Sequence, residues 1–562
     1  MVSLRRFREK WLRTCSRMML LAFLCSNILS LGLCIQSAYA DAPAGDPGGS
    51  ATGTAADVVD AGGSAFVVSK PTDTTAPDYA TKMKAYTDYT DQVAKEPLAL
   101  KLADGVGQNR IAINFVWTLV TGYLVMFMQA GFAMVECGLC RAKNAAHVFM
   151  TNFMIYGIGM LGFWIAGFAF MFGSMGGAAP ANLGGIPSIN GPDFHGLIGT
   201  HGFFLSGNTY DTAAFTLFLF QMVFMDTTAT IPTGAMAERW KWSAFVVYGF
   251  FVSIIVYPIY GHWVWGNGWL ANIGTNWHLG HGAVDFAGSG VVHAIGGWTA
   301  LAGAMVLGPR IGKYSRDGKP NVLAAHNLPM ALIGCFILAF GWFGFNPGST
   351  LGASGAGNLR IGVIATNTML ASAGGAMAAM LYMMARTGKP DPGMCGNGLL
   401  AGLVAITAPC AFINSVSAVI IGVIAGVVVC ISCVVVERAG VDDPVGAISV
   451  HGVCGIWGVL SVGIFADGVY GAGWNGVGAA TYLGKAGMGV TGLLYGDWSQ
   501  FAAQVVDSVV NIVWAFGISY LFFKAQKAIM GIRSKPEDEI AGLDIPEMGV
   551  LAYQPDEVAV PA

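Results

Sequence analysis

The chain has 562 residues, of which 54% are hydrophobic and 11% are charged. Soluble domains carry about 25% charged residues, so this composition excludes a string of soluble domains and indicates a polytopic membrane protein. The formal net charge of −3 gives no reason to expect nucleic acid as a partner. The 11 cysteines form no CxxC pair or ligand-like cluster, so we expect neither a disulfide framework nor a metal site, and no cofactor.

The first 40 residues are typical of a secretory signal peptide. Basic residues precede an apolar run that begins at Met18, and Ala38-Tyr-Ala40 is a small-x-small cleavage site. An uncleaved first helix is the alternative.

Residues 41–106 are rich in Ala, Gly, Asp, Thr and Pro and poor in large apolar residues. Such a composition predicts an exported, largely disordered segment, with a short surface helix over residues 79–95. We expect no chemistry there.

Apolar segments of membrane-spanning length follow. A helix needs about 20 apolar residues to cross a bilayer. The eleven segments that meet this requirement are 111–137, 146–172, 212–236, 243–265, 285–308, 327–346, 361–386, 395–412, 415–437, 446–466 and 502–524. The sequence therefore predicts an all-α membrane domain over 107–525, followed by a polar cytoplasmic tail, 526–562.

The charges of the loops predict the orientation of these spans. Loops after odd-numbered spans carry most of the Lys and Arg residues, whereas loops after even-numbered spans carry only Arg360 and Lys485. Because Lys and Arg are enriched in cytoplasmic loops, we expect the N-terminus outside and the C-terminus inside, in the cell inner membrane.

Two stretches share the pattern D-x-x-G-x-x-x-V-H-x-x-x-G. One begins at Asp285 and leads to His293, and the other begins at Asp443 and leads to His451. In the predicted topology they enter the membrane from opposite faces, and a rise of about 12 Å places each histidine near the midplane. This predicts an inverted repeat of five plus five spans, with the eleventh outside it and the substrate site at the interface of the repeats.

Both aspartates lie at helix starts, where a carboxylate can cap free N–H groups. For Asp443 we expect this structural role. For Asp285 a cap and a part in transport remain open. His147, His262, His281 and His326 lie near span ends, and we expect them to be structural.

Aromatic residues are abundant around the paired histidines. Phe220 and Phe224 lie in the third span, Trp265 ends the fourth, and Phe345 and Ser349 end the sixth. By spacing alone the phenylalanines would be packing residues and Trp265 a tryptophan of the membrane interface. We see no Ser/His/Asp set and no HExxH motif, and we expect no enzyme. We also expect no carboxylate deep in a span, and therefore no chain of acidic proton carriers. The pattern predicts a hydrophobic conduit with two imidazoles.

Several longer motifs carry a resemblance to a known family. They are GAMAERWKW, DFAGSGVVH, HNLPMALIGCFILAFGWFGFNPGS, DDPVGAISVHGVCGIWG and GIRSKPEDEIAGLD. Over about residues 107–553 the chain resembles the ammonium transporters of the Amt/Mep/Rh type, and among these the bacterial Amt proteins. The resemblance implies a homotrimer with one ammonia-conducting pore in each subunit.

The resemblance also implies roles for individual residues. Phe220, Trp265 and Ser349 match an outer site that recruits ammonium. Phe224 and Phe345 match a stacked gate below it. His293 and His451 match the twin histidines of the pore, and Asp285 the acid of its outer half. Gly542 and Asp544 lie in a tail that the resemblance makes regulatory and available to trimeric PII-type signalling proteins.

These roles agree with elementary chemistry. Aromatic faces attract a cation by about 0.5–2 kcal/mol each. An intact ion loses its hydration in an apolar pore, and ammonium can avoid this cost by giving up a proton. Imidazole nitrogens can then bind ammonia or relay the proton. We expect an ammonium transporter; an ammonium sensor and an Rh-like channel for ammonia or carbon dioxide are the alternatives. Whether a proton accompanies ammonia stays open.

Overall fold

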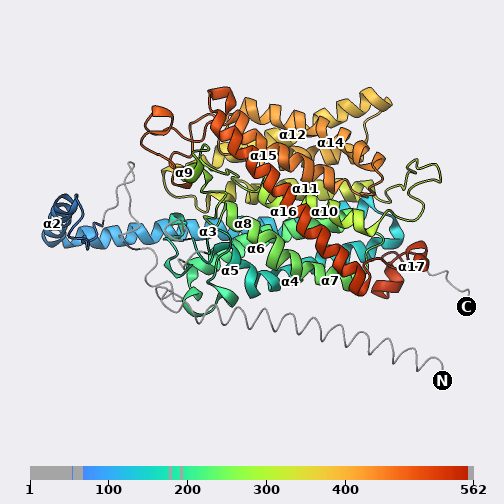
Figure 1. The fold of residues 1–562 in the computed structure, drawn as a ribbon, viewed down its shortest axis with the longest axis horizontal. Helices are drawn as coiled ribbons and strands as arrows, with labels where there is room; N and C mark the ends of the chain where they lie inside the picture. Colours follow the sequence, from blue (N-terminus) through green and yellow to red (C-terminus); the bar gives the residue numbers. More distant parts are fainter. Residues whose placement is uncertain (1–53, 55–66, 176–179, 190–193, 555–562) are drawn as a thin grey trace, which may run out of the picture.

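A computed structural model describes residue 54 and residues 67–175, 180–189 and 194–554. Within these residues the chain is helical, with isolated β-bridges and no named strand, and ten helices are long and apolar enough to cross a membrane. The helices lie side by side in one bundle (Figure 1). The all-α membrane class is therefore confirmed, whereas the predicted signal peptide, 1–40, lies outside the described residues.

The ten helices correspond to ten of the predicted spans. They are α3 (Pro97–Leu139), α4 with α5 (Ala145–Gly162, Phe168–Phe172), α6 (Thr212–Ala235), α7 with α8 (Trp242–Phe251, Tyr257–Val264), α10 (Ile295–Leu307), α11 (Leu328–Phe345), α12 (Ile361–Thr387), α14 (Ser415–Arg438), α15 (Cys454–Phe465) and α16 (Trp498–Met530). The predicted eighth span is the shorter apolar helix α13 (Pro392–Ile406), which has 15 residues.

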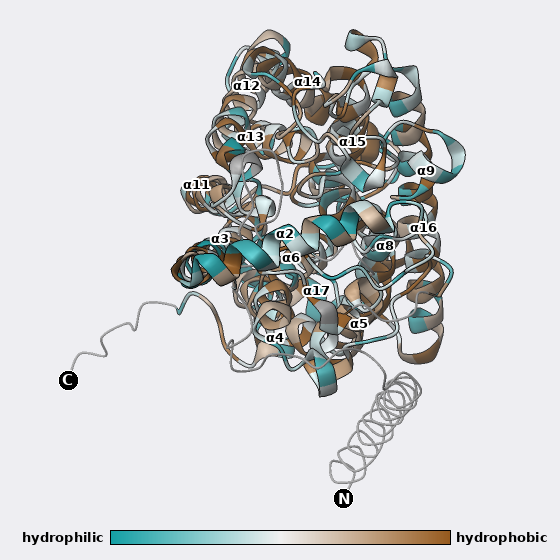
Figure 2. Cartoon of the chain, turned by 90° about the vertical axis from the view of Figure 1, so that its left-hand side faces the viewer, coloured by the Kyte–Doolittle hydropathy of each residue, from teal (hydrophilic) through white to brown (hydrophobic). Residues whose placement is uncertain are grey.

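The first long helix, α3, begins at Pro97 and not near residue 111. Its 43 residues give a rod of about 64 Å, roughly twice the apolar thickness of a bilayer. Its first turns project from the bundle beside α2 (Tyr79–Lys95), which forms where the surface helix was predicted (Figure 1). Residues 79–95 are thus helical as predicted, and residues 97–106 are helical as well. Figure 2 shows that α2 is largely hydrophilic.

The two motif helices enter the bundle from opposite ends. The segment after α10 contacts the C-terminal tail through Ile311 N, which donates to Glu539 Oε1 at 2.7 Å, so Asp285 lies at the far end. Arg310, next to Ile311, also binds Asp442, which places Asp443 at the tail end. We call these ends the outer side and the tail side.

Both histidines lie in π-helical turns, which precede α10 and α15. His293 lies in Ser289–Ala294 and His451 in Ile448–Val453. Such turns widen a helix locally and are frequent at functional sites. The two motif helices touch just beyond them, because a Cβ on Gly297 would stand 2.1 Å from Gly452 N. The backbones of the two motifs therefore meet at the depth of the histidines.

Candidate functional site

The predicted recruitment residues share one cavity on the outer side. Phe220, Trp265 and Ser349 line a space of about 200 Å³, together with Phe224 and Asp285. Trp265 Nε1 donates to the backbone oxygen of Asp285 at 2.7 Å, which fixes the indole. Ser349 Oγ donates to Phe345 O at 2.8 Å, so its lone pairs can accept a bond from a ligand. The cavity thus combines aromatic faces with a hydroxyl acceptor.

Two stacked phenylalanine rings close the floor of this outer cavity. The ring centroids of Phe224 and Phe345 are 4.1 Å apart and the planes are 28° apart. Phe220 packs on Phe224 at 4.7 Å. All three rings are buried, so a solute passes this point only if the rings move.

The histidine pair lies directly beyond the rings. His293 stacks against Phe345 at 5.3 Å and against Trp342 at 5.1 Å. Its Nδ1 is 3.2 Å from Nδ1 of His451, so one ring donates and the other accepts. His293 Nε2 has no hydrogen-bond partner among the described residues. The two imidazoles are thus a polar pair among aromatic side chains.

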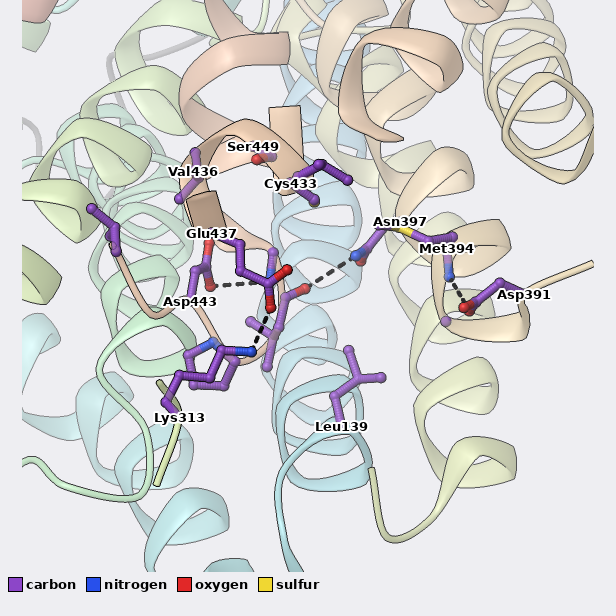
Figure 3. Close-up of a pocket in the computed structure, with 16 residues that line it drawn as sticks. Leu139, Lys313, Asp391, Met394, Asn397, Cys433, Val436, Glu437, Asp443 and Ser449 are labelled. Atoms are coloured by element: carbon purple, nitrogen blue, oxygen red, sulfur yellow. Dashed lines mark hydrogen bonds and ion pairs between the residues drawn. The ribbon is translucent and has the colours of Figure 1, made fainter. Parts of the chain in front are cut away.

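Two further cavities continue the route toward the tail side. His451, Phe132 and Glu136 line a small cavity of about 20 Å³, which is enough for one water. Asn397 and Val445 line this cavity and also a larger one of about 250 Å³. We call these the small cavity and the exit cavity. Figure 3 shows the exit cavity with Lys313, Glu437 and Asp443 on one side and Asn397 on the other.

Both motif aspartates cap the helices that follow them. Asp285 accepts bonds from the backbone N–H groups of residues 288, 289, 290 and 291 at 2.8–3.0 Å. Asp443 accepts from the backbone N–H groups of Gly446 and Ile448 at 3.0 and 2.7 Å. Asp285 is thus the more completely bound cap, although it also lines the outer cavity. Its structural role does not depend on a role in transport.

Three carboxyl groups lie deep in the bundle, and the expectation that acidic groups would be lacking there is wrong. They are Glu136 in α3, Asp226 in α6 and Asp507 in α16, each at most 3% exposed. A single acid within an apolar run is rare, and the sequence contains one at all three positions. Only Glu136 lines one of the three cavities of the route.

The four histidines expected to be structural lie away from these cavities. His262 Nδ1 bonds Met171 O at 2.8 Å, and His326 bonds Cys140 O at 2.9 Å. His147 packs edge-on against Trp242, and His281 packs against Tyr482. None of them lines the outer, small or exit cavity.

A buried charge cluster holds the loops of the tail side together. Arg310 binds Asp442 through Nε and Nη2, each at 2.9 Å, and Glu238 through Nη1 at 2.7 Å. Arg141 binds the other oxygen of Glu238. Burial raises the pKa of Asp442, but Arg239 and Arg310 outweigh this effect and lower it to about 2. This cluster could not be predicted from the sequence, because its members come from four separate loops.

The tail packs against the same loops, although its composition alone suggests a solvated end. His147 N donates to Asp544 Oδ1 at 3.0 Å, and Leu543 N donates to Asn144 Oδ1 at 2.9 Å. Gly542 has φ +107°, and a Cβ there would stand 2.4 Å from Lys143 O. Gly542 and Asp544 therefore fix the tail to the segment between α3 and α4.

The fold defines a polytopic membrane protein in which the outer cavity, the stacked rings, the histidine pair and the two further cavities follow one another. The model of the Ammonium Transporter Family matches residues 116–553. Ammonium transporter Amt2 of Archaeoglobus fulgidus is 49% identical over 445 residues, which cover 79% of this chain and 88% of that relative. A putative ammonium transporter of Synechocystis is 36% identical over 444 residues, 78% and 88% of the two chains. The chain belongs to the ammonium transporter family.

Solved structures agree with this assignment. A structure described as a sensor Amt protein is 37% identical with a TM-score of 0.66, and the match covers 78% of this chain and 98% of that one. Mep2 of Candida albicans is 26% identical with a TM-score of 0.61 and coverages of 76% and 87%.

Proposed function

We propose that the protein recruits ammonium in the outer cavity, removes a proton there and conducts ammonia past the histidine pair to the exit cavity. One observation carries this proposal. His293 contacts both Phe345, a ring that closes the outer cavity, and His451, so the polar histidine pair begins directly beyond that cavity. Family membership makes ammonium the substrate to test first.

The arrangement supports selection by deprotonation rather than by size. Potassium and ammonium are similar cations, and both are attracted by the faces of Phe220 and Trp265. The stacked rings of Phe224 and Phe345 offer no ligand that could replace hydration water. Ammonium crosses this barrier once it has become neutral ammonia, whereas potassium has no proton to lose. Ammonia can then hydrogen-bond to the imidazole nitrogens.

The proposal is tested in proteoliposomes that receive an ammonium pulse, with electrical recording and isotopic uptake in parallel. Wild type should show ammonium-dependent flux. His293→Ala and His451→Ala each remove one half of the polar pair, and we expect uptake to fall by about tenfold or more, as for loss of a positioned proton-transfer group. His278→Asn is the matched control, because His278 is exposed with φ +57°, a conformation that Asn tolerates.

Absence of both current and uptake in the wild type would refute the proposed transport function. An ammonium sensor is then the second candidate, because one solved neighbour is described as a sensor Amt protein. Binding of ammonium without flux would support it. The Rh-like gas channel fits less well, since Trp265 and Ser349 both line the outer cavity.

We further propose the setting in which the protein works: the cell inner membrane, with eleven spans, the N-terminus outside and the tail in the cytoplasm. A homotrimer, which the family resemblance implies, would cover part of the large apolar side chains that α12 and α14 expose, such as Leu381 and Val435. A PII-type signalling protein would act at the tail side, where residues 532–554 lie against the loops.

The tail should detach if Gly542 acquires a branched side chain. Gly542→Val forces a Cβ against Lys143 O and requires a φ that valine rarely adopts. We expect faster proteolysis of the tail, with trimers intact and with altered ammonium uptake or PII binding. Gly549→Ala is the control, because its Cβ would meet nothing within 4 Å although its φ is also positive. Unchanged proteolysis in Gly542→Val would contradict the docking role.

A further inference from the structure

Glu136 is a buried carboxyl group beside the conduit. It lies in the last turns of α3 and is 3% exposed. Its side chain lines the small cavity with His451, and this cavity has room for one water. His451 uses Nδ1 toward His293, which leaves Nε2 as the nitrogen that can face the cavity. Water in this cavity would lie between the histidine pair and a carboxyl group.

The partners of Glu136 are neutral. Asn152 Nδ2 donates to its Oε2 at 2.7 Å, and Thr233 Oγ1 lies 2.8 Å from the same oxygen. Thr230 Oγ1 donates to Asn152 Oδ1 at 2.7 Å, which turns the amide N–H toward Glu136. Across the described residues, Glu136 takes part in no ion pair. A carboxylate kept without a counterion inside a helix bundle is costly and calls for a function.

The hydroxyl of Thr233 can serve both protonation states of Glu136. Its Oγ1 lies within hydrogen-bond distance of Glu136 and also 2.5 Å from Thr230 O. When Glu136 is ionised, the hydroxyl can donate to it. When Glu136 carries a proton, the hydroxyl can donate to Thr230 O and accept from the carboxyl group. Neither state leaves a buried donor without an acceptor.

We propose that Glu136 accepts the proton that leaves the histidine pair toward the tail side, an inference that rests on the proposed ammonium transport. The N–H bond at His451 Nε2 of a protonated pair breaks as water in the small cavity takes that proton and gives one to a Glu136 oxygen. The imidazolium becomes neutral imidazole and the carboxylate becomes a carboxylic acid. Transfer to water of the exit cavity, past Asn397 and Val445, restores the carboxylate.

The decisive variants are Glu136→Gln and Glu136→Asp. Glutamine keeps an acceptor for Asn152 and a partner for Thr233 but cannot carry a proton, whereas aspartate can. Asp226→Asn is the matched control, because Asp226 is equally buried in a span and lines none of the three cavities. In proteoliposomes we expect Glu136→Gln to lower the ammonium-induced current by about a hundredfold or more. Glu136→Asp should keep most of the current and Asp226→Asn all of it.

An infrared difference spectrum gives a readout that a packing role would not change. Adding ammonium to the wild type should alter an absorption of the protonated carboxyl group, and this change should be missing in Glu136→Gln. A current within about twofold of wild type in Glu136→Gln, or an equal loss in Glu136→Asp, overturns the proposal, as do identical spectra of wild type and Glu136→Gln. Missing flux in the wild type would instead refute the proposed transport. The infrared difference between the wild type and Glu136→Gln would then still show whether Glu136 changes its protonation when ammonium is added.

Discussion

Arg310→Ala should lower the free energy of unfolding by about 3–5 kcal/mol, the usual cost of removing one partner from a buried ion pair. Asp442 and Glu238 would both lose the guanidinium that binds them, and both are buried. Arg310→Lys should recover only part of the loss, because an ammonium group cannot reproduce the two-point contact with Asp442. Thermal unfolding in detergent measures both variants.

Lys319→Ala is the control for this prediction, since its ion pair with Asp317 is exposed and contributes little. The cluster also predicts that stability depends on pH. Because the pKa of Asp442 falls from 3.8 to about 2 on folding, the contribution of Asp442 to the free energy of unfolding is present above about pH 4 and disappears as the pH drops toward 2. In wild type this contribution is about 2 kcal/mol. Equal unfolding temperatures of wild type and Arg310→Ala would contradict the structural role of the cluster.

Asp285→Ala should abolish transport and also destabilise the fold. It leaves four buried N–H groups without an acceptor, at about 1–3 kcal/mol for each group that does not find another partner. Loosening of this turn would move His293, which lies in the π-helical turn that Asp285 caps. We expect a fall in unfolding temperature together with loss of ammonium uptake.

Two comparisons separate the cap from a charge that acts in transport. Asp285→Asn keeps one oxygen for two of the four N–H groups, so the fold should be affected less than in Asp285→Ala. If uptake falls equally in both variants while stability differs, the negative charge matters beyond the cap. Asp443→Ala removes only two bonds from backbone N–H groups and should cost less stability than Asp285→Ala. The reverse order would contradict the account of the two caps.

Hydropathy and repetition were sufficient to predict the elements that form the route. Each predicted apolar segment corresponds to a helix, and the shared D-x7-H spacing predicted that His293 and His451 would lie at the same depth. The structure adds the π-helical turns, which have no sequence signature of their own. That aromatic residues from separate spans, such as Phe224 and Phe345, lie close together could be predicted only from the family resemblance. Their spacing alone is that of ordinary packing.

The features that the sequence analysis did not predict depend on tertiary contacts or on single residues in long apolar runs. The first turns of α3 contain Lys101 and Asp104, so a hydropathy criterion starts the span too late. Arg310 and Asp442 look like ordinary loop charges until the loops converge. Glu136 ends a long hydrophobic segment, where average hydropathy conceals one acid. The tail looks like a solvated end because polar residues that bond to loops have the same composition as residues that bond to water.

The closed part of the route is short, and this has an electrical consequence. Between the outer and exit cavities lie the ring gate, two imidazoles and a space for one water. Where water reaches into both cavities, the membrane potential falls mainly across this section. A charge that crosses it experiences about 2.3 kcal/mol for each 100 mV, whereas neutral ammonia and a turning phenylalanine ring experience none. The voltage dependence of the ammonium current therefore reports how many protons cross between the two cavities.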